Sequence, residues 1–217
     1  PTEAPVIELL SPVSSENYYS DQLIQFSALV SDLENEPEEL LITWTSSVDG
    51  ELSLDNYINS AGEISDYSYL TEGNHAIELR VEDGSGKVST DEVVVQVGGE
   101  NNLPQCSITE PVNGTTVTLG DMVVFQATTS DPDIPANELL VEWISDKDGS
   151  FGTSTPSSDG TIIFAYDGLS SDSHAISLNV SDEVGSLCSA QILLNVGNAP
   201  IITIDQPLDG SVYSIGN

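Results

Sequence analysis

The chain repeats itself at long range, and this repeat constrains the fold more than any other feature. "HAIELRVEDGSGKVS" (75–89) and "HAISLNVSDEVGSLC" (174–188) each begin with one of the two histidines, 99 positions apart. The same shift places Phe26 on Phe125 and Trp44 on Trp143, and we expect it to hold until the linker between the repeats. A period near 100 residues is the size of a small domain. The 217 residues therefore hold two units and the beginning of a third.

We expect a first domain at 1–99, a second at 100–198, and an incomplete element at 199–217. The last segment, "PIITIDQPLDGSVYSIGN", resembles the opening of the second unit. It is long enough for one or two strands and too short for an independent fold. It therefore represents either the first strands of a truncated third repeat or a strand donated to a neighbouring molecule.

Alternating hydrophobic and polar residues predict half-buried strands throughout both units. Ile77, Leu79 and Val81 share one parity, and charged residues occupy the positions between them. No segment shows a helical period. The strands of the first unit are expected near 22–30, 40–46, 62–70, 75–82 and 88–97. About seven short strands per unit, separated by turn residues, are typical of an all-β, immunoglobulin-like Greek-key β-sandwich with the tryptophan between its sheets.

A sequence pattern in each unit resembles the polycystic-kidney-disease (PKD) and cadherin-like repeats. The pattern L-x-x-G-x-H-x-I-x-L-x-V-x-D-x-x-G begins at Leu70 and ends at Gly86, and the stretch from Ser130 to Gly149 is similar to the same family. The resemblance implies immunoglobulin-fold modules joined in tandem along bacterial or archaeal surface proteins. It also implies an extracellular or cell-surface location.

The charge of the chain limits its partners. The sequence has 36 Asp plus Glu against three Lys plus Arg, a formal net charge of −33. Nucleic acid is excluded as a partner because there are no cations to replace phosphate counterions, and anionic membranes are repelled. No apolar run is long enough to insert into a membrane. The acids are either a solvated surface suited to a salty medium or, in part, ligands of bound cations.

The fold would gather acidic loops at the end of each sandwich where its first strand enters. Oxygen ligands from flexible loops suit Ca²⁺, which also relieves repulsion between close carboxylates. We therefore predict Ca²⁺ at the junctions, with solvated turn residues as the alternative. The predicted ligands at the second unit are Asp131, Asp133, Asp182 and Glu183, with Glu100, Asn101 and Asn102 from the linker. Their counterparts in the first unit are Asp32, Glu34, Glu36 and Asp83.

The two cysteines and two sequons suggest covalent modifications. Cys106 and Cys188 lie at inward parity on the first and last strands of the second unit. We expect a disulfide there rather than two buried thiols, and hence an oxidising compartment. Asn113 and Asn179 begin N-x-[ST] sequons, so both are candidate glycosylation sites.

No catalytic motif is present, and a single histidine in each unit is expected to be structural. The leading hypothesis is a non-enzymatic structural segment of a secreted, cell-surface or filament-forming protein. Its partners would be neighbouring repeats or identical subunits, with Ca²⁺ stiffening the junctions. The alternative is an adhesin or polysaccharide-binding accessory module with a glycan or cell-surface ligand. That alternative needs exposed aromatic residues, for which the candidates are Tyr18, Tyr19, Tyr57, Tyr67 and Tyr69.

Overall fold

The computed structural model describes residues 3–198, 210 and 212. The chain divides into two compact units with the boundary after Asn102, and each unit is described by itself. Both are β-sandwiches, and the described residues contain no α-helix. The predicted all-β fold class is confirmed. The predicted segment at 199–217 lies outside the described residues, apart from positions 210 and 212.

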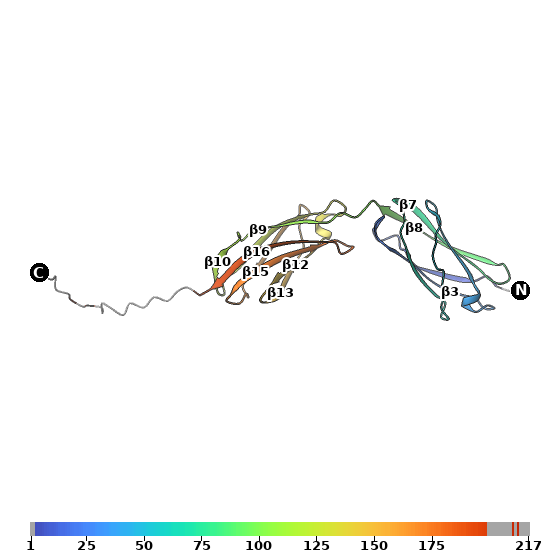
Figure 1. Cartoon of the computed structure of the whole chain (residues 1–217), viewed down its shortest axis with the longest axis horizontal. Coiled ribbons are helices and arrows are strands. Elements are labelled where there is room, and N and C mark those ends of the chain that lie inside the picture. Colours follow the sequence, from blue (N-terminus) through green and yellow to red (C-terminus); the bar gives the residue numbers. More distant parts are fainter. Residues whose placement is uncertain (1–2, 199–209, 211, 213–217) are drawn as a thin grey trace. The chain divides into compact units, whose positions relative to one another are not determined.

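The first unit pairs a sheet of three strands with a sheet of five (Figure 1). The strand order in the small sheet is β1-β3-β6, and in the large sheet it is β2-β8-β7-β4-β5. All ladders are antiparallel except that of β2 with β8, which is parallel. The elements are β1 (Val6–Ser11), β2 (Tyr18–Tyr19), β3 (Ile24–Ser31), the 3₁₀ helix η1 (Pro37–Glu39), β4 (Leu41–Ser46), β5 (Gly50–Glu51), β6 (Glu63–Ser68), β7 (Gly73–Glu82) and β8 (Val88–Gly98).

The second unit repeats this topology with β14-β11-β9 facing β10-β16-β15-β12-β13. Its β10 again pairs in parallel with the last strand, β16. The elements are β9 (Gln105–Glu110), β10 (Thr115–Thr118), β11 (Val123–Ser130), the 3₁₀ helix η2 (Ala136–Glu138), β12 (Leu140–Ser145), β13 (Gly149–Ser154), β14 (Thr161–Tyr166), β15 (Ser173–Ser181) and β16 (Leu187–Gly197).

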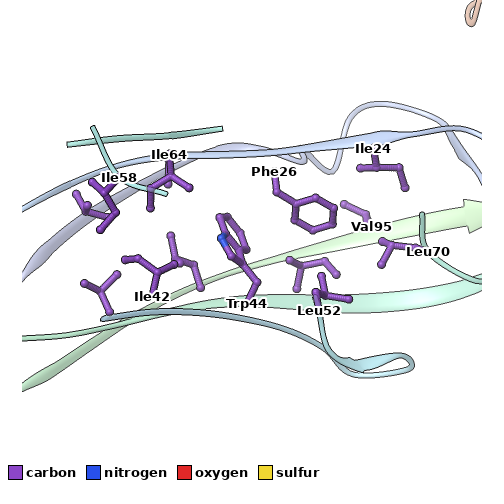
Figure 2. Packing of buried hydrophobic residues seen from close by; sticks show 14 of the residues in the cluster. Ile24, Phe26, Ile42, Trp44, Leu52, Ile58, Ile64, Leu70 and Val95 are labelled. Carbon is purple, nitrogen blue, oxygen red and sulfur yellow. The ribbon is translucent and has the colours of Figure 1, made fainter. Parts of the chain in front are cut away.

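The core of each unit lies between its two sheets, where the alternating apolar residues meet. In the first unit Trp44 is fully buried beside Phe26, at a ring-centroid distance of 5.5 Å in an edge-to-face arrangement. Figure 2 shows the indole between the two layers, with Ile42 and Leu52 on the β4 side. A large ring on the central strand thus fills the inter-sheet space, as the alternation predicts.

The repeat shift of 99 does not hold along the whole unit, which corrects the expectation from the sequence. Ile24 pairs with Ser68, and its equivalent Val123 pairs with Tyr166, so β6 and β14 are related by a shift of 98. Asp66 of β6 therefore corresponds to Phe164 of β14. Because strand side chains alternate between faces, this one-residue slip decides which side chains of β14 enter the core.

The slip gives the second unit a more aromatic core than the first. Phe164 and Tyr166 join Phe125, Trp143 and Phe151 in one cluster with ring centroids 5.1–6.3 Å apart. The second unit is also cross-linked, because Cys106 on β9 and Cys188 on β16 form a disulfide with a Cα–Cα distance of 5.9 Å. These strands belong to different sheets, so the bond ties one layer to the other.

Candidate functional site

The histidine of each unit is held in a closed hydrogen-bond network. His75 is fully buried at the start of β7. Its Nε2 lies 2.7 Å from the carbonyl oxygen of Thr71, and its Nδ1 lies 2.7 Å from Oγ of Ser46. A carbonyl only accepts, so Nε2 carries the proton and Nδ1 accepts from the serine hydroxyl. The serine oxygen in turn accepts from the backbone N–H groups of Val48 and Asp49.

The second unit reproduces this network residue by residue. His174 Nε2 lies 2.8 Å from the carbonyl oxygen of Ser170, and its Nδ1 lies 2.8 Å from Oγ of Ser145. Ser145 accepts from the N–H groups of Lys147 and Asp148. Each histidine therefore links two turns of its unit. One turn follows the fourth strand of the unit, and the other precedes the strand that carries the histidine. The sequence indicated a structural histidine at a strand start, and this network specifies what it holds.

An aspartate beside each histidine strengthens the same turns. Asp49 accepts from the Thr71 N–H, and Oδ2 lies 3.7 Å from His75 Nδ1. Burial opposes ionisation of Asp49, but the two hydrogen bonds from Thr71 outweigh it and lower the pKa. For Asp148 the hydrogen bonds from Ser170 are the largest influence and lower its pKa.

These Ser, His and Asp side chains are not arranged as a catalytic triad. A triad needs the serine and the carboxylate on opposite ring nitrogens and a hydroxyl that a substrate reaches. Here Ser46 and Asp49 both approach Nδ1, and Ser46 and His75 are buried. The network therefore serves the fold. The signal that could have revealed it was the repeat, since Ser46 falls on Ser145 and Thr71 on Ser170.

The acidic loops at the other end of the first unit fold around their own aspartates. Asp32, in the loop between β3 and β4, accepts through Oδ1 from the N–H groups of Glu34 and Asn35. Asp83, in the turn between β7 and β8, accepts through Oδ1 from the N–H groups of Ser85 and Lys87. The two loops are in contact, since a Cβ on Gly84 would lie 3.2 Å from Nδ2 of Asn35.

The second oxygen of each of these aspartates is buried and unused. Oδ2 of Asp32 and Oδ2 of Asp83 have no hydrogen-bond partner among the described residues, and Asp83 is only 5% exposed. Burial opposes ionisation of Asp83, but hydrogen bonds from the Lys87 N–H and from Ser85 outweigh it and lower its pKa. Two anionic oxygens from adjoining loops are thus left without a compensating donor.

The second unit repeats the loop geometry. Asp131 accepts through Oδ1 from the N–H groups of Asp133 and Ile134, and its Oδ2 is buried without a hydrogen-bond partner among the described residues. Asp182 accepts through Oδ1 from the N–H groups of Val184 and Ser186. Asp182 is buried, whereas Asp133 and Glu183 are exposed.

The other predicted ligands contribute to the same loops in different ways. Glu34 Oε2 accepts from the N–H of Glu3, and the N–H of Glu36, which precedes η1, donates to Oε2 of Glu39, the last residue of η1. In the linker, the N–H of Asn101 donates to Asp21 within the first unit. Asn102 donates to the carbonyl of Glu100, and Glu100 is exposed.

Within the described part of the chain, no group of three or more His, Cys, Asp or Glu side chains is arranged to hold a metal ion. The shared junction ligand set stays a prediction.

The candidate glycosylation and glycan-binding residues differ in accessibility. Asn113 lies in an exposed turn and accepts through Oδ1 from the Leu193 N–H, and Asn179 is half-buried on β15. Tyr19 is buried in the first unit. Burial raises the pKa of Tyr18 to about 12, and its hydroxyl is hydrogen-bonded to Val13 and Glu16. The Tyr19 ring is therefore inaccessible to a ligand, whereas Tyr18 is half-buried with its hydroxyl already hydrogen-bonded.

Comparison with known proteins supports the fold. No protein-family model and no curated protein matches the chain. Among solved structures, it is similar to the fibronectin(III)-like modules of CbhA from Clostridium thermocellum, at 16% identity over 93% of this chain and 100% of that one, with a TM-score of 0.67. It also matches a chimeric titin Z1Z2 (19% identity, 92% and 100% covered, TM-score 0.44) and the Ig1-2 module of the Drosophila receptor tyrosine phosphatase DLAR (14%, 89% and 99%, TM-score 0.35).

The likeness to CbhA identifies a tandem of fibronectin- or immunoglobulin-like sandwiches. Among the described residues, no helix is long and apolar enough to span a membrane.

Proposed function

We propose that the chain is a non-enzymatic spacer segment of a secreted or cell-surface protein, in which Ca²⁺ bound by the acidic loops stiffens PKD- or cadherin-like repeats. The observation that carries the proposal is the pair of adjoining loops in which Asp32 and Asp83 each present a buried carboxylate oxygen without a hydrogen-bond partner among the described residues. An unpaired buried anionic oxygen is costly, and a cation removes that cost.

The chemistry of these loops favours a hard divalent ion. Calcium accepts six to eight oxygens from carboxylates, carbonyls and water in flexible geometry, whereas Mg²⁺ demands a near-ideal octahedron. Because Oδ1 of each aspartate is already bound to backbone N–H groups, the loop is folded before the ion arrives. In this proposal carbonyls and water complete the shell.

The disulfide of the second unit supports an oxidising, extracellular compartment for this protein. A disulfide between Cys106 and Cys188 is typical of proteins that fold in an oxidising environment. The shortage of cationic side chains also favours a protein that meets counterions in its surroundings.

Calorimetric titration of the chelator-treated chain with CaCl₂ tests the binding step. We expect saturable binding that Asp83→Asn and Asp32→Asn weaken at least tenfold at one site. Glu92→Gln removes the same charge from an exposed position on β8 and should leave binding unchanged. The proposal fails if Ca²⁺ neither binds nor raises the thermal midpoint, or if Glu92→Gln weakens binding as much as Asp83→Asn.

Small-angle X-ray scattering tests the stiffening step separately. Adding Ca²⁺ should narrow the distribution of particle dimensions, and EGTA should reverse the change. If Ca²⁺ binds but the scattering does not change, the cation site stands and the stiffening role is refuted.

A further inference from the structure

A row of tyrosines follows the edge strand β6 on the outer face of the first unit. Tyr57, Tyr67 and Tyr69 are 74%, 55% and 57% exposed. Among the described residues, their hydroxyl groups make no hydrogen bond. Tyrosine is a common strand residue, so exposure by itself assigns no role. The arrangement of the three rings carries more information.

The pairing of the strands places the three rings on one face. Ile58 and Ile64 form an isolated bridge and are both buried, so Tyr57 and Ser65 point away from the core. Tyr67 lies two residues after Ser65 and therefore on the same face. Tyr69 precedes the buried Leu70 and follows the half-buried Ser68, so it also points outward.

The groups beside the rings are able to hydrogen-bond; Gln25 and Ser65 are neutral, and Glu63 at the start of β6 is a carboxylate on the same outward face. Gln25 on β3 pairs with Tyr67, and its amide nitrogen donates to Oγ of Ser65 at 3.2 Å. Both residues are exposed, so their remaining donor and acceptor capacity faces solvent. Between Ser65 and Tyr69 the face therefore combines flat amphipathic rings with neutral polar groups, and the carboxylate of Glu63 lies at its other end, which adds to the repulsion of an anionic ligand.

The second unit lacks this face, although it has the same strands. With the shift of 98 that relates β6 to β14, Tyr57 and Tyr67 correspond to Thr155 and Ala165. Tyr69 precedes the buried Leu70, and the residues before the equivalent Leu169 are Asp167 and Gly168, neither of which is aromatic. The turns before the two strands agree with this shift, since Asn59 bonds Glu63 as Ser157 bonds Thr161. The rings are thus a property of the first unit and not a requirement of the fold.

We infer that this face, formed by Tyr57, Tyr67, Tyr69, Gln25 and Ser65, binds an extended neutral polysaccharide. A pyranose ring has an apolar C–H face that stacks on an aromatic ring and a rim of hydroxyls that bond amides and hydroxyls. Tyrosine provides such a surface because its ring is apolar and its hydroxyl is polar. The net charge of −33 excludes anionic polymers, since no cationic side chain belongs to the face. This inference is independent of the cation loops.

Affinity electrophoresis of the full chain, in gels containing one soluble polysaccharide each, tests the inference. The neutral probes are a β-glucan, a galactomannan and hydroxyethyl cellulose, and polygalacturonate is the anionic probe. We expect retardation by at least one neutral probe and none by polygalacturonate. Each single Tyr→Ala change should weaken binding about three- to tenfold, and the triple change should abolish it.

Two controls separate binding from folding. Met122→Ala with Ile163→Ala alters exposed residues on the outer face of the second unit and should bind as the wild type does. The triple variant should keep the wild-type melting profile, because its three side chains lie outside the core. The inference is overturned if no neutral probe retards the chain, if the triple variant binds equally well, or if polygalacturonate binds as strongly as the neutral probes.

Discussion

Removing one buried hydroxyl should show how much the histidine network stabilises each unit. In the variant Ser46→Ala, Nδ1 of His75 loses its donor, and the N–H groups of Val48 and Asp49 lose their acceptor. An unpaired buried acceptor costs about 1–3 kcal/mol, and each partly buried N–H adds roughly 0.5–1 kcal/mol. We expect the unfolding free energy of the first unit to fall by about 2–5 kcal/mol, a large part of a domain's total of about 5–15 kcal/mol.

Urea unfolding followed by tryptophan fluorescence measures this loss in one unit at a time. Each unit contains one tryptophan, so in a Trp143→Phe background Trp44 reports the first unit alone. Ser47→Ala is the matched control, because its Oγ accepts one exposed bond from the Ala76 N–H. It should cost less than about 1 kcal/mol. Equal costs for Ser46→Ala and Ser47→Ala would refute the reasoning.

Two further predictions follow from buried polar atoms. Trp143 donates through Nε1 to Ser154, whereas Nε1 of Trp44 is buried without a partner among the described residues. Trp44→Phe should therefore cost its unit about 1–2 kcal/mol less than Trp143→Phe costs the other, in urea unfolding followed by circular dichroism because each variant lacks the tryptophan of its unit. The pKa of Asp83 lies below its ordinary 3.8 in the folded state, so its ionised form stabilises the unit above that pH, and the stabilisation is lost as the pH falls through the lowered value. The difference in unfolding free energy between wild type and Asp83→Asn should therefore be constant from pH 7 to about 5 and shrink at lower pH; a difference unchanged at pH 3 would contradict this.

The positions of the central strands could be predicted because their alternation has no competing interpretation. The strands expected at 22–30, 40–46, 75–82 and 88–97 are β3, β4, β7 and β8, within two residues at each end. Burial on one face and exposure on the other requires apolar residues at every second position, and this signal is strong where the strand is flanked on both sides.

The edge strand was misaligned because residue identity and side-chain direction disagree there. A shift of 99 places Tyr67 on Tyr166, which looks like a match in the sequence. In the structure Tyr67 points to solvent, while Tyr166 packs against Phe151 and Phe164. A one-residue slip exchanges the two faces of a strand, and only the pairing with β3 or β11 fixes it.

The acidic loops illustrate a different limit of the sequence. The prediction gathered Asp32 and Asp83 from the topology, and the structure does bring their loops together. The sequence did not indicate that each aspartate uses one oxygen for hydrogen bonds within its own turn, because such Asx-type bonds depend on the local backbone conformation. In each aspartate one oxygen is used by the turn, and the other makes no hydrogen bond among the described residues. This difference between the two oxygens makes Asp32 and Asp83 candidate cation ligands.

A chain with so few cations must stabilise its carboxylates by means other than ion pairs. The ion pairs of Arg80 with Glu82 and Lys147 with Asp146 are partly exposed, and pairs of this kind contribute little. Backbone N–H groups stabilise several of them instead, in the turns of Asp83, Asp182 and their counterparts, through hydrogen bonds to an ionised acceptor, which are stronger than neutral ones. These bonds fix the loops locally but leave the repulsion among the 36 acids uncompensated. Counterions from the medium screen that remaining repulsion, and the Ca²⁺ proposed for the loops of Asp32 and Asp83 would reduce it locally.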